Sequence, residues 1–376
     1  MEEFNQTKNY IFIGGGIMAE RLYQHLESEK CKLIGVMDTM NPEKRTKKSF
    51  REHQIKTLDC FSDEINSGEV AVVLAINAFE SFEAINQYLN VYNYPEECLY
   101  VPNPYTTLRP CVMNDEFAAE IRIPIYDKRY DVVESLFEDD ISKKIFNLLK
   151  NSKPYDNKKD SFELIPYSCI KDMYWCSEDY WQTYEFNDVV ENDKATVIDC
   201  GAYIGDSVIP LCNKIPQKEI YYYAFEPNKE NANIIRKNTN FLMLCKEMNV
   251  MEYGVGNCDS KMYFELPESK QKDAGRFIDN PKGSEEIALE IKKIDGMNLK
   301  LNGDVYIKMD IEGSELSALE GATELIRKYK PYLAICVYHR KNDLIQIPLY
   351  LRELVPNYKF YLRGGFHTIL WAIPSI

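Results

Sequence analysis

Hydrophobic and polar residues alternate along two separate stretches of the chain in the manner of strands followed by helices. In residues 10–105, the apolar runs NYIFIG, KLIGVMD and EVAVVLAI have the length of buried strands, and AERLYQHLESEK has apolar positions at helical spacing. Strands that alternate with helices predict βαβ units and a parallel sheet. An α/β domain is therefore expected over residues 1–108.

The second stretch shows the same pattern from Ala195 onward. Its apolar strands are ATVIDCG, IYYYAFE, DVYIKMD and YLAICVYH, with helical segments between them. Two adjacent apolar runs follow, KFYLRGG and TILWAIP, and they predict a last strand that is antiparallel. A second α/β domain is expected over residues 191–376.

Residues 109–190 differ from both stretches. The segment DVVESLFEDDISKKIFNLLKN, residues 131–151, has apolar residues at helical spacing and predicts a helix. The segment MYWCSEDYWQTYEF, residues 173–186, is rich in aromatic rings. We expect a helical connector whose aromatic end covers the second domain.

Composition narrows the class of protein. The 376 residues carry a formal net charge of −14, with 45% hydrophobic and 28% charged side chains. This balance is typical of a globular protein and argues against nucleic acid or anionic lipid as partners, since phosphates require clustered Lys and Arg. No apolar run reaches the roughly 18 residues of a membrane span, and the N-terminus has no secretory pattern. The 11 cysteines include no CxxC pair, so we expect reduced thiols in a cytoplasmic protein.

The first candidate site is the segment VIDCGAYIGDS. Asp199 ends an apolar strand, and Gly201 and Gly205 bracket a turn that opens a helix. Glycines at a strand–helix junction let a ligand approach the backbone, and a carboxylate offers a partner for a cationic or hydroxyl-bearing group. The spacing D-x-G-x-x-x-G differs from the dinucleotide fingerprint and suits a smaller ligand such as S-adenosylmethionine. A purely structural turn is the alternative.

Two more strand ends carry carboxylates. Glu226 follows the strand IYYYAFE, where an acidic side chain can accept both hydroxyls of a ribose, and Asn228 lies beside it. Asp310 ends the strand DVYIKMD, so it should lie at the same sheet edge. Glu312 and Glu315 follow at the start of a helix, whose dipole favours carboxylates, and stabilisation of the first turn is the alternative role of Glu315.

The segments DCGAYIGDS, AFEPN, IKMDIEGSELSALEGA and PYLAICVYH, in this order, resemble the FkbM-type methyltransferases over residues 196–374. The resemblance implies a class I methyltransferase fold, an α/β sheet of seven strands with the last strand antiparallel. It also implies S-adenosylmethionine as cofactor and O-methylation, in many members of a sugar or polyketide hydroxyl.

The same resemblance implies roles for particular residues. Asp199 and Gly201 would hold the methionine end of the cofactor, and Glu226 would hold the ribose. Residues near Asn249 to Glu252 would lie along the adenine. Family members often have a final hairpin rich in aromatic residues and histidine, whereas here the segment reads LRGGFHTILWAIP, in which His367 is either a remnant of that pattern or a turn residue.

Transfer of a sulfonium methyl group to a hydroxyl requires in-line alignment and benefits from a base. His339, at the end of the strand YLAICVYH, is the first candidate for that base, and a structural hydrogen bond is the alternative. Asp310 is the second candidate, and Lys308 would polarise or orient the hydroxyl. Tyr180 and Trp181 would either cover the cofactor or pack in the core. No cluster has dedicated ligand spacing, so no metal is expected.

The first domain has its own glycine motif. The segment IFIGGGIMAERL places Gly14, Gly16 and Ala19 in a G-x-G-x-x-A match between strand and helix, and Asp38 ends the next strand. The arrangement resembles the Rossmann-type domain at the start of nucleotide-sugar acetyltransferases. A nucleotide or nucleotide-sugar site, a nicotinamide dinucleotide site and a degenerate docking domain all fit.

The leading hypothesis is an S-adenosylmethionine-dependent O-methyltransferase that acts on a sugar, nucleotide-sugar or polysaccharide hydroxyl, within polysaccharide biosynthesis. A nucleotide-sugar-binding or scaffolding protein with an inactive methyltransferase domain is the second hypothesis. A nicotinamide-dependent oxidoreductase is the third, although residues 50–150 show no matching catalytic set.

Overall fold

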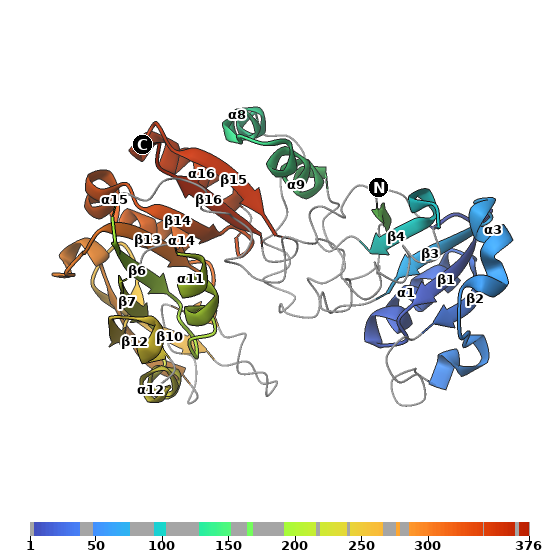
Figure 1. The fold of residues 1–376 in the computed structure, drawn as a ribbon, viewed down its shortest axis with the longest axis horizontal. Helices are drawn as coiled ribbons and strands as arrows, with labels where there is room; N and C mark the ends of the chain where they lie inside the picture. The colour runs from blue at the N-terminus through green and yellow to red at the C-terminus, as the bar shows by residue number, and fades with distance from the viewer. Residues whose placement is uncertain are drawn as a thin grey trace. The chain divides into compact units, whose positions relative to one another are not determined.

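The computed structural model describes residues 4–37, 48–75, 94–102, 128–151, 164–167, 192–215, 219–238, 241–265, 276–278, 286–340, 342–364 and 368–375. The chain divides into two compact units (Figure 1). The first comprises Met1–Ala119 and Ser152–Glu178, and the second comprises Glu120–Asn151 and Asp179–Ile376. The residues expected as a connector are thus shared between the units.

The first unit contains a sheet in the order β2-β1-β3-β4-β5. Strands β2, β1, β3 and β4 run parallel to one another, and β5 is antiparallel to β4. The strands are β1 Asn9–Ile13, β2 Lys32–Met37, β3 Val70–Leu74, β4 Leu99–Pro102 and β5 Leu164–Pro166. The described helices are α1 Ile17–Ser28, α3 Ser62–Asn66 and the 3-10 turns η1 Lys48–His53, η2 Asp59–Phe61 and η3 Glu96–Cys98.

The three strands expected at the start of the chain are β1, β2 and β3. Every residue of β3, VAVVL, is buried, which is typical of an inner strand covered on both faces. Phe12, Leu22 and Phe50 are among the buried side chains of this unit's core. The parallel order agrees with the α/β pattern that the sequence predicts.

The second unit contains a seven-stranded sheet in the order β15-β16-β14-β13-β6-β7-β8. Strand β16 is antiparallel to both of its neighbours, and the other neighbouring pairs are parallel. The strands are β6 Lys194–Cys200, β7 Glu219–Phe225, β8 Glu247–Met251, β13 Asp304–Met309, β14 Tyr332–Cys336, β15 Lys359–Arg363 and β16 Ile369–Ile373. The helices that follow these strands are α11 Val208–Lys214, α12 Lys229–Lys237, α13 Phe241–Leu244, α14 Glu315–Glu320, α15 Thr323–Tyr329 and α16 Asp343–Leu354.

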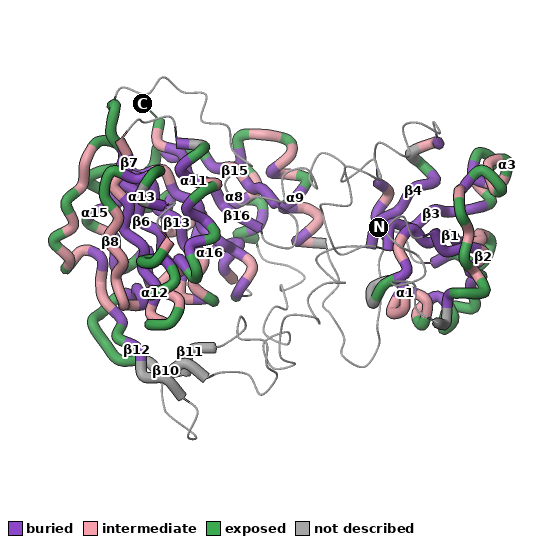
Figure 2. The backbone as a smooth tube through the Cα atoms, turned by 60° about the horizontal axis from the view of Figure 1, so that its bottom comes forward, coloured by how far each residue is buried: buried purple, intermediate pink, exposed green. Residues whose placement is uncertain are grey.

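The core of this unit lies along its central strands, which Figure 2 shows as a buried layer. Tyr222 and Trp371 are fully enclosed and pack in one cluster with residues of β6, β13 and β14. Burial of such large side chains removes 150–250 Å² each from water, by rough estimate. Because these central strands are buried, the residues at their carboxyl ends are held in fixed positions.

A smaller sheet has the strand order β11-β10-β12-β9, and its strands fall between β8 and β13 in the sequence. Its strands are β9 Gly254–Val255, β10 Ser260–Glu265, β11 Arg276–Ile278 and β12 Glu286–Lys292, and the turn η4 Ile294–Gly296 follows. Strand β10 is antiparallel to β11 and β12. Strand β12 is parallel to β9.

Residues 131–151 form two helices, α8 Arg129–Leu136 and α9 Asp140–Asn151. Phe137 between them has extended backbone and forms a parallel bridge with Phe360 of β15. The Asp139 carboxylate then accepts a hydrogen bond of 2.8 Å from the Ser142 backbone N–H and caps α9. The expectation of a single helix was wrong at its centre, because Phe137 pairs with a strand far along the chain.

Some expectations fall outside the described residues, namely those on Asp38, Tyr180, Trp181 and His367. Among the described helices, none combines the length and the apolar character that crossing a membrane requires.

Candidate active site

Three parallel strands bring their carboxyl ends to one edge of the seven-stranded sheet. Lys308 of β13 lies opposite Asp199 of β6, and Asp199 lies opposite Ala224 of β7. Glu226 is the first residue after β7, and Asp310 is the first residue after β13. Ligands of open α/β sheets bind at this edge, outside the carboxyl ends of the strands.

The turn after β6 requires glycine at two positions. Gly201 has φ +84°, and a Cβ built on it would lie 2.0 Å from the backbone oxygen of Asp310. Gly205 has φ +87°, and its Cβ would lie 2.5 Å from the ring of Phe241. Gly201 and Ala202 both donate backbone hydrogen bonds to the Phe225 oxygen, at 3.0 Å. The turn therefore packs directly against the ends of both β13 and β7.

Glu226 lies immediately after β7 and is 7% exposed. Its carboxylate accepts hydrogen bonds from the backbone N–H of Tyr203, at 2.8 Å, and of Asn228, at 2.9 Å. Burial raises the pKa of this carboxyl group to about 6, although the two backbone donors oppose the shift. Asn228 caps α12 by accepting from the Glu230 and Asn231 N–H groups.

These residues fit S-adenosylmethionine. The two backbone donors use one lone pair on each Glu226 oxygen, so both oxygens keep acceptor capacity for ribose hydroxyls. Between Gly201 and Gly205 the turn also includes Tyr203, whose φ is +46°. A bound cofactor brings a sulfonium methyl group that is already electrophilic.

Asp199 forms a buried network instead of facing solvent. It is fully buried, accepts a 2.7 Å hydrogen bond from the Tyr222 hydroxyl, and lies 3.0 Å from the ammonium nitrogen of Lys308. Lys308 is 4% exposed and also donates to the Gly201 backbone oxygen at 2.6 Å. Burial lowers the pKa of Lys308, but the charges of Asp199, Asp310 and Asp206 and the hydrogen bond to Asp199 together raise it. The ammonium is buried against the glycine turn, which departs from the expected contact with an acceptor hydroxyl.

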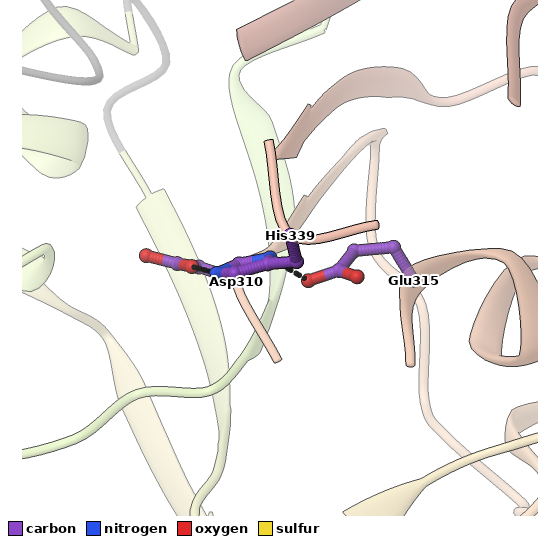
Figure 3. A group of neighbouring side chains, drawn as sticks. All are labelled: Asp310, Glu315 and His339. Atoms are coloured by element: carbon purple, nitrogen blue, oxygen red, sulfur yellow. Dashed lines mark ion pairs between the residues drawn. The ribbon is translucent and has the colours of Figure 1, made fainter. Parts of the chain in front are cut away.

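His339 lies three residues beyond β14, with the carboxylates of Asp310 and Glu315 on either side of its ring (Figure 3). Its Nδ1 lies 2.8 Å from Oε1 of Glu315, and its Nε2 lies 3.4 Å from Oδ1 of Asp310 and 3.7 Å from Oε2 of Glu312. The imidazole is 2% exposed. Burial lowers the pKa of His339, but the negative charge of Glu315, Asp310 and Glu312 raises it to about 10.

Neighbouring groups hold this cluster in place. The Tyr338 hydroxyl donates to Oδ1 of Asp310 at 3.0 Å, and the Ile311 N–H donates to Oε1 of Glu315 at 2.9 Å. Asp343, buried at the start of α16, accepts from the Arg340 N–H at 2.8 Å. Burial and the charge of Glu315 raise the pKa of Asp343 to about 7.

The residues expected along the adenine are those of β8 and its end. Asn249 is half-buried in β8 and donates to the Glu247 carboxylate at 3.1 Å. Glu252 forms an ion pair of 2.6 Å with Arg236 of α12. Because β8 pairs with β7 in parallel, these residues lie on the Glu226 side of the sheet edge.

In the first unit, Gly14 has φ +104° and donates to the Met37 backbone oxygen at 2.7 Å. Gly16 is the N-cap of α1, and a Cβ on it would have no neighbour within 4 Å. The positive φ of Gly14 therefore favours glycine at the first position of the motif. At Gly16 a larger side chain would meet no steric obstacle within 4 Å of its Cβ. A nucleotide or nucleotide-sugar site here stays a prediction.

The order of the seven strands, the antiparallel β16 and the glycine turn after β6 fit a class I methyltransferase. Residues 199–359 match the family model described as Methyltransferase FkbM domain, so this part of the chain is an FkbM methyltransferase domain. The expectation of a methyltransferase is confirmed, and S-adenosylmethionine is the cofactor of this class.

Among solved structures, the methyltransferase FkbM from Methylobacillus flagellatus KT is similar, with a TM-score of 0.54 and 20% identity over 98% of this chain and 90% of that chain. This likeness shows the fold. A SAM dependent methyltransferase from Aquifex aeolicus gives a TM-score of 0.29 and 15% identity, over 50% of this chain and 85% of that one. The N-terminal domain of human METTL16 in complex with SAH gives a TM-score of 0.28 and 12% identity, over 70% of this chain and 91% of that one. No curated protein matches the chain.

Sequence reasoning did not single out Tyr222 or Asp343. Tyr222 is one of three consecutive tyrosines in an apolar strand, and only the fold shows that its hydroxyl meets Asp199. Asp343 follows a polar loop in the sequence and looks like an ordinary first-turn carboxylate.

Proposed function

We propose that the second unit transfers the methyl group of S-adenosylmethionine to an oxygen of a small-molecule or glycan hydroxyl. The observation that carries the proposal is the order of groups along one sheet edge. Glu226 lies beyond β7, the glycine turn beyond β6, and the Asp310–His339 pair beyond β13 and β14. The residues proposed for the donor and those proposed for the acceptor thereby lie along one edge of the same sheet.

At the donor end, Glu226 accepts the ribose hydroxyls and the turn from Gly201 to Gly205 holds the methionine end. Asn249 and the residues up to Glu252 lie along the adenine. Asp199 and Lys308 do not contact the cofactor in this proposal. Lys308, paired with Asp199, donates to the Gly201 oxygen and so holds the glycine turn in position. They are therefore positioning residues in this proposal, and Asn228 orients Glu226 through its backbone N–H.

At the acceptor end, the hydroxyl lies against Asp310 and His339, and these two residues act on its proton. Asp310 is the more accessible group, since its side chain is 21% exposed and that of His339 is 2% exposed. The reaction needs little further assistance, because the leaving sulfur is a cation that becomes neutral on transfer. Alignment of oxygen, methyl carbon and sulfur supplies most of the acceleration.

The direct test is incubation of the full chain with S-adenosylmethionine carrying a labelled methyl group and a panel of sugars, nucleotide sugars and glycans. We expect label in an alkali-stable methyl ether together with one equivalent of S-adenosylhomocysteine. Calorimetry that shows no binding of S-adenosylmethionine would overturn the proposal. Label found on nitrogen or carbon would overturn its oxygen acceptor alone.

A further inference from the structure

One imidazole in the second unit shares its charge among several carboxylates. Oxygens of Asp310, Glu312 and Glu315 each lie within ion-pair distance of His339. Ligand atoms of Asp310, Glu315 and His339 lie within 4.8 Å of one another (Figure 3). The imidazolium carries one positive charge, and Lys308 also interacts with Asp310, but among the described residues no other cation forms an ion pair with Glu312 or Glu315. Buried carboxylates are normally paired with cations or bound to a metal.

The two nitrogens of His339 have different surroundings. Nδ1 lies 2.8 Å from Oε1 of Glu315, but the two atoms are not aligned for a hydrogen bond. The second Glu315 oxygen, Oε2, is also buried without a hydrogen-bond partner among the described residues. Both atoms are enclosed, in side chains that are 2% and 0% exposed. Buried polar atoms without hydrogen bonds are rare in native proteins and require an explanation.

Two carboxylate oxygens face Nε2 of His339. Nε2 lies 3.4 Å from the Asp310 oxygen and 3.7 Å from the Glu312 oxygen, beyond the usual hydrogen-bond length of about 2.9 Å. Ligands about 2.1 Å from a common cation in tetrahedral geometry lie about 3.4 Å from one another. The Glu312 side chain is 45% exposed, which leaves a route from solvent.

We propose that Asp310, Glu312 and Nε2 of His339 bind a divalent transition-metal cation such as Mn²⁺ or Zn²⁺. Coordination at Nε2 would leave the ring proton on Nδ1, and a small rotation of the ring would then align this N–H with Oε1 of Glu315, 2.8 Å away. A histidine that ligates a metal commonly has its other nitrogen against a carboxylate in this way. One imidazole with carboxylates favours such cations over Mg²⁺, which prefers oxygen alone. This part rests on the proposed function: the cation would hold the acceptor oxygen and lower the pKa of its hydroxyl, in place of direct action of Nε2 on the proton.

The test is calorimetric titration of the full chain, freed of metal by a chelator, with MnCl₂ and with ZnCl₂ in the absence of S-adenosylmethionine. We expect one saturable site per chain for the wild type. Glu312→Gln and Asp310→Asn should weaken binding more than about tenfold. The matched control is Glu324→Gln, an exposed carboxylate on α15, which should bind as the wild type does.

Glu312 is the decisive position, because its half-exposed side chain can be replaced without opening the core. Absence of a saturable site in the wild type, or equal binding by Glu312→Gln and Glu324→Gln, would overturn the proposal. Tighter binding of Mg²⁺ than of Mn²⁺ would also overturn it. Titration of the same metal-free samples with S-adenosylmethionine separates the two proposals, since donor binding by Glu226 does not depend on the cation.

Discussion

Glu226 is the residue whose surroundings bear most directly on the methyl donor. We expect Glu226→Gln to weaken S-adenosylmethionine binding by about 1.5–3 kcal/mol, the range for hydrogen bonds to a charged group. Calorimetry on the purified chain measures the change. The control is Glu219→Gln, at the opposite end of the same strand, where the carboxylate pairs with Lys194 and Lys246. Equal affinities in the two variants would remove Glu226 from the donor site.

The raised pKa of Glu226 predicts a pH dependence of donor binding. The carboxylate is ionised above pH 6 and accepts the ribose hydroxyls best in that state, whereas below pH 6 it takes up a proton. We expect the affinity for S-adenosylmethionine to fall as the pH is lowered from 7.5 to about 5, which spans the shifted pKa. The Glu226→Gln variant should show a flat profile over this range, and a wild-type profile equally flat would contradict the assignment.

The ion pair of Lys308 and Asp199 predicts a stability effect. Removal of either partner leaves a buried charge without compensation. We expect Lys308→Met to lower the free energy of unfolding by about 3–5 kcal/mol.

Urea denaturation measures this loss, with Lys359→Met as the control at an exposed position of β15. Adding Asp199→Asn to Lys308→Met should restore part of the lost stability, since both charges are then gone. A double variant that is less stable than Lys308→Met by the full effect of Asp199→Asn would show that the two residues act independently.

At the scale of elements, the glycine turn after β6 joins the strand to α11 and touches two other strand ends. We expect Gly201→Ala to abolish measurable donor binding and to destabilise the fold, because its Cβ would overlap the Asp310 oxygen at 2.0 Å and φ is +84°. Gly296→Ala is the control, since nothing lies within 4 Å of its Cβ. Thermal unfolding and calorimetry are the measurements; a Gly201→Ala protein with wild-type affinity would refute the role of the turn.

The whole second unit includes the helix pair α8–α9 as part of its core. Tyr130, Phe137 and Phe146 of this pair are buried, and Ser142 accepts a hydrogen bond of 2.9 Å from the Leu362 N–H. Arg363 of β15 also donates to the Asp139 carboxylate at 2.5 Å. These contacts tie the pair to the seven-stranded sheet.

A fragment that begins at residue 192 should therefore be less stable than one that begins at residue 128. The expected difference exceeds about 3 kcal/mol, the cost of removing a single buried Phe side chain. Urea denaturation of both fragments, followed by near-ultraviolet circular dichroism, measures it. Identical midpoints would show that the helices contribute nothing to the fold of the second unit.

The sequence by itself determined the strands, the glycine turn and the carboxylates that follow strands. Apolar runs such as VIDC and YIKM mark buried parallel strands, and parallel strands bring their carboxyl ends to one edge, so Asp199, Glu226 and Asp310 were predictable as neighbours. Positive φ at Gly201 follows from the same turn. These features depend on residues close together in the chain.

Only the tertiary structure decided what each of these side chains contacts. Lys308 lies beside Asp199 because β13 pairs with β6, although the two residues are more than a hundred positions apart. Phe137 breaks a helical pattern because it meets β15. His339 has three carboxylates around it because two strand ends and one helix start converge. Long-range strand pairing decides how deeply each carboxylate is buried and which charged groups lie beside it. Burial and neighbouring charge in turn decide which carboxylates can contact a ligand and which only hold other residues in position.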